Sequence, residues 1–316
     1  MLRVRNLSKK IGGLQVIDNM TFSAVKGEIF GILGPNDSGK TIAMKMITGL
    51  ITPTSGVIEI GDTDIAQSPM LAKKLIGYLP DGMPFYKEMT VINFLQFIAE
   101  IRGIRQQDKY KRLAEVVKQT QLEDVLEHRI STLARSFQCK LAIAQALVHD
   151  PEILILDEPT NGLDPNQEHG VRKLIKDLAK DKCVILATRT ISDIEYICDR
   201  VAIIANGKIV VESTPEELAH QSPFHNTLQL RVTKSVKSEN IVDVIRTIAE
   251  ITRVERIDSK RDEINLRIYP RSKFIPLSTI NQLAEDLDWE ILDLQVIAGR
   301  LEEVFRTITT RYQPVI

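Results

Sequence analysis

The stretch that decides the fold of this 316-residue chain is Gly34-Pro35-Asn36-Asp37-Ser38-Gly39-Lys40-Thr41. It fits the pattern G-x-x-x-x-G-K-[ST], in which glycines let backbone N–H groups close round phosphate oxygens. The apolar run EIFGILG (28–34) precedes it, and the helical pattern TIAMKMITGL (41–50) follows it. A strand, a glycine-rich loop and a helix N-terminus in this order predict a phosphate-binding loop. Lys40 is then expected to reach the β- and γ-phosphates, and the Thr41 hydroxyl to bind Mg²⁺.

A second motif, ILILDE (153–158), places two acids at the end of a buried apolar strand. Ligands of open α/β sheets bind at the carboxyl ends of the strands, so both acids are expected beside the phosphate loop. Asp157 is expected to hold Mg²⁺ directly or through water. Glu158 is expected to orient or deprotonate the attacking water. The alternatives are a glycine-rich turn without a ligand and a strand that ends in solvated acids.

Further apolar runs, CVILAT (183–188) and RVAIIA (200–205), are typical of strands that are buried on both faces. They alternate with amphipathic stretches over residues 1–220. The fold class predicted for this part is α/β, with a mostly parallel sheet covered by helices.

The pattern changes after the polar stretch HQSPFHNT (220–227), which is predicted to be a linker. Residues 228–316 are predicted to form a smaller α+β domain with the order β-α-β-β-α-β, which is typical of a ferredoxin-like fold. The expected elements are strands at 228–234 and 289–297, helices at 238–251 and 276–287, a hairpin across SKRD, and a last helix at 299–312.

Composition excludes several classes of protein. The formal net charge is −1, so no basic face for nucleic acid is expected. No apolar run reaches the roughly 18 residues of a membrane span, and the N-terminus lacks the apolar region of a signal peptide. Cys139, Cys183 and Cys198 share no metal-type spacing and are expected to be reduced structural thiols. We therefore expect a cytoplasmic chain whose membrane contact comes through a partner.

On the basis of the phosphate loop and the ILILDE motif, the chain resembles ABC ATPases. The run AQALVHDPEILILDEPTNGLDP (144–165) is close to the family's Walker B and D-loop pattern, with Asp164 as the D-loop aspartate. The resemblance covers residues 2 to about 218. IGYLPDGMPFYKEMTV (76–91) and GRLEEVFRTIT (299–309) look like subunits of ABC-2-type exporters, such as drug, polysaccharide and gliding-motility systems.

The resemblance implies an ATP-binding subunit on the inner face of the cell membrane. It implies ATP and Mg²⁺ as ligands, a second ABC ATPase subunit paired head to tail, and transmembrane partner subunits. ATP would lie between one subunit's phosphate loop and the other's signature motif. Lys40 and Glu158 would be catalytic, and Thr41, Asp157 and Asp81 would hold the metal. The remaining nucleotide contacts implied are Gly34, Pro35, Asn36, Asp37, Ser38, Gly39, Ile42 and Arg189.

The sequence also departs from the family pattern. The signature L-S-x-G-x falls on Leu133 to Phe137, where Ala134 lacks the serine hydroxyl and Ser136 replaces a glycine. The aromatic residue that stacks on adenine falls at Ile11, and Cys139 replaces a usual glutamine.

Four other departures concern the phosphate side. The Q-loop glutamine falls on Asp81, and Ile42 replaces a hydroxyl residue. The switch histidine falls on Arg189, which is either a charged γ-phosphate contact or a drifted side chain directed to solvent or Glu158. Asp37 takes the place of a glycine, and aspartate tolerates left-handed backbone better than most residues, although its charge would repel phosphates.

Two functional hypotheses follow. The chain is either a working ATPase subunit of an ABC-2-type exporter, or a degenerate subunit that binds ATP while a paralogous partner hydrolyses it. In a homodimer the altered signature and the altered switch residue fall in both ATP sites, whereas in a heterodimer each site has one of them. A soluble ABC protein of DNA repair or translation is the third reading, and the coiled-coil insertions or tandem domain that it needs are missing. Residues 228–316 are expected to be a dimerisation or regulatory module, with small-ligand sensing as the alternative.

Overall fold

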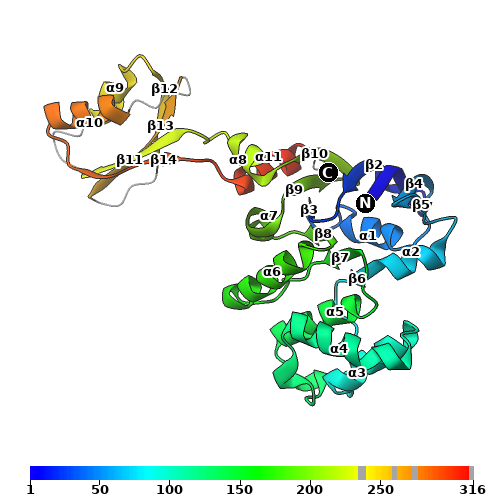
Figure 1. Ribbon diagram of the computed structural model, residues 1–316. Helices are drawn as coiled ribbons and strands as arrows, with labels where there is room; N and C mark the ends of the chain where they lie inside the picture. The colour runs from blue at the N-terminus through cyan, green and yellow to red at the C-terminus, as the bar shows by residue number, and fades with distance from the viewer. Residues whose placement is uncertain (234–239, 258–261, 272–276, 313–316) are drawn as a thin grey trace. The chain divides into compact units, whose positions relative to one another are not determined.

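The computed structural model describes residues 1–233, 240–257, 262–271 and 277–312 (Figure 1). The chain divides into two compact units. The first comprises Met1–Pro215 together with the chain from Ile308 onward, and the second comprises Glu216–Thr307. The expected domains, 1–220 and 228–316, differ from this division at two places: residues 216–220 fall in the second unit, and the chain from Ile308 onward falls in the first.

The centre of the first unit is a six-stranded sheet in the order β10-β9-β3-β8-β7-β6. Neighbouring strands pair in parallel except β10, which is antiparallel to β9. Every residue of β3, β7 and β8 is buried, which explains their uninterrupted apolar runs. The predicted α/β sheet is therefore confirmed. The strands are β3 (Ile29–Leu33), β6 (Ile76–Leu79), β7 (Ile153–Asp157), β8 (Cys183–Thr188), β9 (Arg200–Ala205) and β10 (Lys208–Ser213).

Two apolar cores cover the two faces of this sheet. One core joins alternate side chains of the sheet, such as Leu154 and Leu186, to the helices that follow β6, β7 and β8. The other joins Ile155 and Ile185 to α1 (Lys40–Ile47) and to a second sheet. The helices of the first core are α3 (Val91–Ile101), α4 (Gln106–Thr120), α5 (Arg135–Leu147), α6 (Pro165–Ala179) and α7 (Ile191–Ile197).

The second sheet is antiparallel, with the order β2-β1-β4-β5, and the sequence analysis does not anticipate it. It consists of β1 (Leu2–Ile11), β2 (Leu14–Ala24), β4 (Ser55–Ile60) and β5 (Thr63–Asp64). Its strands mix exposed charged residues with buried apolar ones, so they lack the continuous apolar runs of the central sheet. Short α2 (Pro69–Leu75) leads from this sheet to β6.

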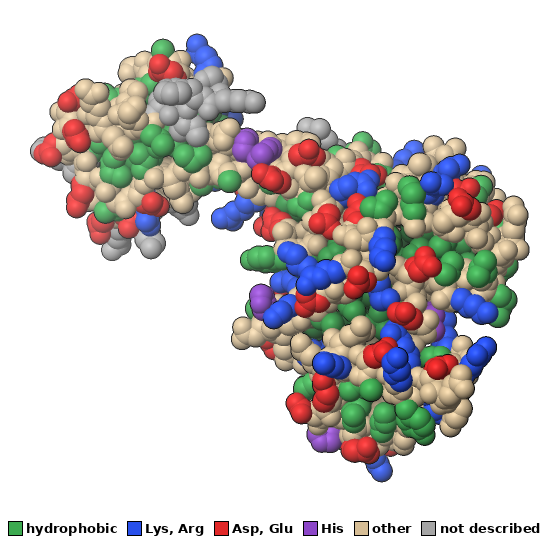
Figure 2. Space-filling model, viewed as in Figure 1, with side chains coloured by type: hydrophobic (Ala, Val, Ile, Leu, Met, Phe, Trp, Pro, Cys, Tyr) green, Lys and Arg blue, Asp and Glu red, His purple; other side chains and the backbone are tan. Residues whose placement is uncertain are grey.

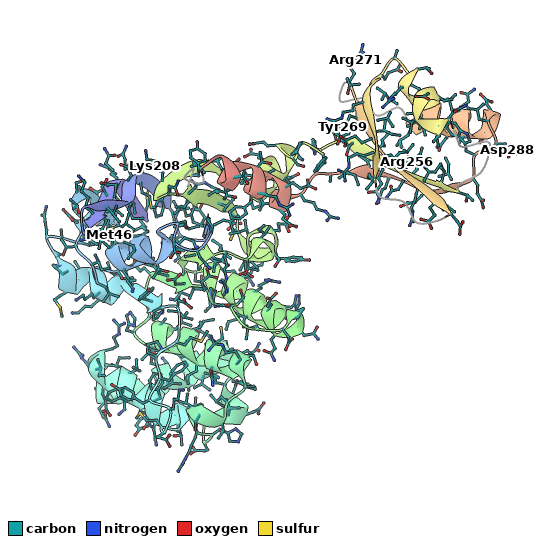
Figure 3. The ribbon with its side chains drawn as sticks, turned by 180° about the vertical axis from the view of Figure 1, so that it is seen from behind. Met46, Lys208, Arg256, Tyr269, Arg271 and Asp288 are labelled. Carbon is teal, nitrogen blue, oxygen red and sulfur yellow. The ribbon has the colours of Figure 1, made fainter. Side chains whose placement is uncertain are left out.

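The second unit has the predicted order β-α-β-β-α-β, and its sheet runs β12-β13-β11-β14 with all pairs antiparallel. The elements are β11 (Thr227–Thr233), α9 (Ile241–Arg246), β12 (Ile251–Ile257), β13 (Glu263–Pro270), α10 (Leu277–Asp286) and β14 (Ile291–Ile297). Helices and sheet enclose their own core, which includes Trp289. On β13 the Tyr269 hydroxyl donates to Glu255 (Figure 3). Most of the predicted hairpin loop lies outside the described residues.

Two helices join the units along the chain. Helix α8 (Pro215–His220) ends on the first residue of the predicted linker. Helix α11 (Leu301–Arg311) contains Ile308, where the chain returns to the first unit. Beyond it, the Asn206 side chain donates a hydrogen bond to the carbonyl of Tyr312. No helix among the described residues is both long and apolar enough to span a membrane. Acidic and basic side chains are interspersed over the face of the first unit seen in Figure 2.

Candidate functional site

The candidate site lies at the carboxyl ends of β3, β7 and β8, as expected for an open α/β sheet. A cavity of about 570 Å³ opens there. It brings together the phosphate loop, Asp81 from the segment after β6, Glu158 from the end of β7 and Arg189 from the end of β8. Its lining is formed by Val16, Asn36, Asp37, Ser38, Gly39, Lys40, Thr41, Ile42, Asp81, Glu158, Asn161 and Arg189.

The phosphate loop bends sharply between β3 and α1, and two of its residues take left-handed backbone. Gly39 has a φ of 99°, and a Cβ there would lie 2.5 Å from the Ile17 side chain, so only glycine fits. Asp37 has a φ of 61°. The short polar side chain of aspartate tolerates that conformation, which is why the loop keeps its bend without the family's glycine.

Lys40 is buried at the start of α1, with its ammonium directed into the loop. Its Nζ donates to the carbonyls of Gly34 at 2.7 Å and Pro35 at 2.9 Å, and lies 4.0 Å from Glu158 Oε1. Burial lowers the pKa of Lys40, while the neighbouring carboxylates of Glu158 and Asp157 oppose that shift. The ammonium is held by groups that an anionic ligand could replace.

Asp157 is fully buried at the end of β7, behind the cavity lining. Burial raises the pKa of Asp157, and the Thr41 hydroxyl and the Lys40 ammonium act against that shift. Neither carboxylate oxygen has a hydrogen-bond partner of good geometry, and the buried Ser38 hydroxyl also lacks one. Buried oxygens without partners are costly unless a ligand or ion satisfies them. Carboxylate and hydroxyl oxygens in this arrangement fit the donor set that Mg²⁺ prefers.

Glu158 takes a left-handed backbone, with a φ of 51°, immediately after β7. Its N–H donates to the carbonyl of Ala187 at 2.9 Å, and its Oε2 accepts from the N–H of Arg189 at 3.4 Å. Burial raises the pKa of Glu158, and the charge of Lys40 opposes the shift. The neighbouring strand β8 thus fixes this carboxylate at the cavity wall, where it can orient a water molecule.

Arg189 directs its guanidinium along the cavity wall rather than toward the Glu158 carboxylate. Nη2 donates to Asn161 Oδ1 at 3.0 Å, and Nη1 donates to Asn36 Oδ1 at 3.4 Å. The side chain therefore links the phosphate loop to the loop after β7 while it stays exposed to solvent. Val16 and Asn161 line the cavity but are not predicted from the sequence: no local pattern marks Val16, and Asn161 lies within the Walker B and D-loop run without a role assigned to it.

The signature segment does not line this cavity. Ala134 is the N-cap residue of α5 and makes no side-chain capping hydrogen bond, so the missing serine hydroxyl falls at a helix start. Asp164, by contrast, caps α6 by accepting from the N–H groups of Asn166 and Gln167, both at 3.0 Å. Ile11 is 46% exposed at the end of β1 and is not among the residues of the cavity wall.

The three cysteines are free thiols, as predicted. Cys139 lies in α5, where its thiol donates to the carbonyl of Pro159 at 2.9 Å. Burial raises the pKa of Cys139 to about 12. The residue that replaces the family's glutamine is thus a packed thiol beneath the loop after β7.

Comparison with known proteins identifies a family and several relatives with similar sequences. The ABC transporter family profile matches residues 17–161. The linearmycin resistance ATP-binding protein LnrL of Bacillus subtilis is 31% identical over 314 residues, which cover 98% of this chain and 99% of the relative. The Nod factor export ATP-binding protein I of Cupriavidus metallidurans is 31% identical over 69% of this chain and 72% of its own length.

Solved structures agree with the fold. CbiO1 from Clostridium perfringens, described as part of the ABC transporter complex CbiONQ, is 27% identical with a TM-score of 0.64. The similarity covers 70% of this chain and 90% of that one.

Proposed function

This chain belongs to the ATP-binding subunits of ABC transporters, and from that premise we propose that it couples ATP binding to movement of the membrane partner of an ABC-2-type exporter. The observation that carries the proposal is the cavity at the carboxyl end of the sheet, where the phosphate loop shares the wall with Glu158 and Arg189 and Asp157 lies buried behind it. The named exporters and resistance proteins among the relatives support the direction of transport.

In the proposed site the phosphate loop cradles the nucleotide phosphates, and Lys40 exchanges its two loop carbonyls for β- and γ-phosphate oxygens. Asp157 and Thr41 hold Mg²⁺, with Asp81 at the cavity edge. The ion offsets the charge of the β- and γ-phosphates. Glu158 orients the attacking water, and Arg189 leaves Asn36 and Asn161 to contact the γ-phosphate.

We propose that the chain pairs head to tail with a second ABC ATPase subunit, since the signature segment stands apart from the cavity and must serve another subunit's phosphate loop. Ala134 and Ser136 weaken that second site, because a missing transition-state donor costs about 10² to 10³ in rate. Arg189 alters the site that this chain builds itself. A partner with an intact signature and switch histidine would leave each site with one defect.

The alternative is a degenerate subunit that holds ATP while its partner hydrolyses. The absence of a side-chain cap at Ala134 favours it. The retained Lys40, Asp157 and Glu158, all buried at one edge of the sheet, favour hydrolysis by this chain.

The deciding experiment is ATP turnover by the assembled complex with Glu158→Gln in this chain alone. A collapse of turnover supports hydrolysis at this chain's site, and unchanged turnover supports the degenerate alternative. Glu152→Gln, at the exposed start of the same strand segment, is the matched control.

For the second unit we propose a dimerisation or regulatory role. Since the chain returns to the first unit at Ile308, the test replaces residues 221–300 by a flexible linker and retains α11. Loss of the dimer in solution is expected. A variant that assembles normally would contradict the dimerisation role.

A further inference from the structure

A fully buried carboxylate, Asp193 of α7, lies outside the cavity but touches both loops that form its wall. Its Oδ2 accepts hydrogen bonds from the Thr160 hydroxyl at 2.6 Å and the Thr188 hydroxyl at 3.1 Å. Its Oδ1 accepts from Arg172 Nε of α6 at 2.7 Å. The three partners come from three different segments of the chain, and all of them are buried.

The two threonines stand next to the proposed catalytic groups. Thr160 follows Glu158 by two residues, and Thr188 directly precedes Arg189. The Thr188 hydroxyl also accepts from the N–H of Thr190 at 2.9 Å, which closes the turn that carries Arg189. The Thr188 carbonyl accepts from the N–H of Gly34 at 3.3 Å, so the same residue reaches the phosphate loop.

Burying this charge has an energetic cost that its pairing with Arg172 only partly offsets. Arg172 is shared with Glu168 at 2.8 Å and with the Ser192 hydroxyl at 2.9 Å. Buried ion pairs contribute little net stability compared with apolar packing, so stability alone is a weak reason for this arrangement. What the carboxylate does is fix two loops against each other.

The position of Glu158 depends on that fixation. Its left-handed backbone is strained for a residue other than glycine, and such a conformation persists where the surroundings determine it. Its carboxylate is bonded at 3.4 Å to the N–H of Arg189, in the turn that Thr188 closes. If the loop after β7 slipped relative to the turn after β8, this contact would open.

We propose that Asp193 is a positioning residue for the ATP site: through Thr160 and Thr188 it fixes the backbone segments that carry Glu158 and Arg189 around one point of the cavity, where the γ-phosphate would lie. The inference rests on the proposed function in that it assigns that point to the γ-phosphate. It adds four buried side chains that support the site without touching the nucleotide: Thr160, Arg172, Thr188 and Asp193.

The test compares Thr188→Val, which removes the hydroxyl at equal size, with Thr188→Ser, which retains it. Turnover of the assembled complex and the dissociation constants for ATP and ADP are measured for each. We expect Thr188→Val to reduce kcat about tenfold and to reduce the preference for ATP over ADP about threefold, because the turn that carries Arg189 loses its hydrogen bond to Asp193. ADP affinity should stay unchanged, and Thr188→Ser should behave like the wild type.

Asp193→Asn should reproduce the Thr188→Val pattern, with exposed Glu195→Gln of the same helix as its control. Thermal unfolding of each variant shows whether it is folded, and the threonine pair carries the test if Asp193→Asn is not. Equal losses of ATP and ADP affinity, or no difference between valine and serine at position 188, would overturn the inference.

The two proposals can fail separately. If Glu158→Gln leaves turnover unchanged, hydrolysis by this chain is refuted, and the preference for ATP over ADP still tests Asp193. If Glu158→Gln stops turnover while Thr188→Val leaves kcat and that preference unchanged, the proposed function stands and the role of Asp193 is refuted.

Discussion

The two edges of the six-stranded sheet, at the amino and carboxyl ends of its parallel strands, differ in how their polar groups are paired. At the amino edge, Asp199 accepts from the N–H of Ile29 at 2.8 Å, and Glu28 pairs with Arg200 at 2.7 Å. At the carboxyl edge, both oxygens of Asp157 and the hydroxyl of Ser38 have no hydrogen-bond partner within the described chain. The groups named at the amino edge have partners within the protein, whereas Asp157 and Ser38 at the carboxyl edge would gain theirs from a ligand.

The difference separates groups that stabilise the fold from groups that serve the site. Polar groups with internal partners add stability whether or not a ligand is present. Buried groups without partners lower the stability of the free protein and gain their partners on binding. Substitutions at the two edges of the sheet test this contrast.

The largest effect is expected from Lys40→Ala at the carboxyl edge. The ammonium provides two charge-assisted contacts to phosphate in the proposed complex, so ATP affinity should fall about 100-fold by calorimetry. Lys26→Ala, at the exposed turn before β3, is the control and should leave ATP affinity unchanged. Similar losses for both lysines would mean that the cavity is not the nucleotide site.

A matched pair of aspartates tests the contrast directly. Asp157→Asn should raise the free energy of unfolding of the nucleotide-free protein by about 1 kcal/mol, because a buried charge without partners is removed. Asp199→Asn should lower it by about 0.5 to 1 kcal/mol, since Asp199 is exposed and the Ile29 N–H exchanges a charged acceptor for a neutral one. Urea unfolding without nucleotide and Mg²⁺ measures both. A change of the same sign in both variants would refute the distinction between the edges.

His149 is the exception at the amino edge. Its Nε2 lies 2.9 Å from the carbonyl of Ile76, but its buried Nδ1 has no partner, and burial lowers the pKa of His149 to about 4. The unfolded chain takes up this proton near pH 6.5, so stability is full above that pH and declines as the pH falls toward 4. Between pH 7 and 5 the loss should be about 1 kcal/mol after allowance for partial exposure.

His149→Gln should remove that pH dependence, whereas exposed His169→Gln should retain it. An unchanged slope in His149→Gln would show that another group carries the loss.

The smallest effect concerns the N-terminus of α5, which lies outside both edges. Ala134→Ser should add an N-cap and raise the free energy of unfolding by about 0.5 to 1 kcal/mol. Thermal unfolding measures this, with Ala66→Ser as an exposed control. If the segment serves a partner's site, the same change also raises turnover of the assembled complex. No gain in either measurement would mean that the missing serine hydroxyl at position 134 limits neither the stability of the protein nor the turnover of the complex.

Local patterns predict the carboxyl edge well and the rest of the site poorly. The continuous apolar runs at 29–33, 153–157 and 183–188 identify buried parallel strands, and their ends place Lys40, Asp157 and Glu158 together. The tolerance of Asp37 for left-handed backbone is also readable from the residue type, and its φ of 61° agrees. Arg189 is ambiguous in the sequence, since one side chain has no periodicity that would fix its direction.

What the sequence does not reveal depends on contacts between distant segments. Val16 reaches the cavity from a hairpin strand that no motif marks, and Asn161 reaches it from the D-loop run, where the motif alone does not show which side chain faces the cavity. Asp193 is one of two acids in a seven-residue helix, and its partners lie between 5 and 33 residues away along the chain. The antiparallel sheet of β1 and β2 escapes notice because exposed charges interrupt its apolar pattern.

The chain leaves the first unit after Pro215 and rejoins it at Ile308, so the second unit is bordered on both sides by the same body. A protease that cuts only one of these crossings leaves the second unit covalently attached through the other, and two cuts are needed to release it. For protein engineering, the pair of crossings defines a cassette that can be exchanged between homologues without moving the end of the chain. A label placed near Tyr312 reports on the nucleotide-binding body, even though it follows the second unit in the sequence.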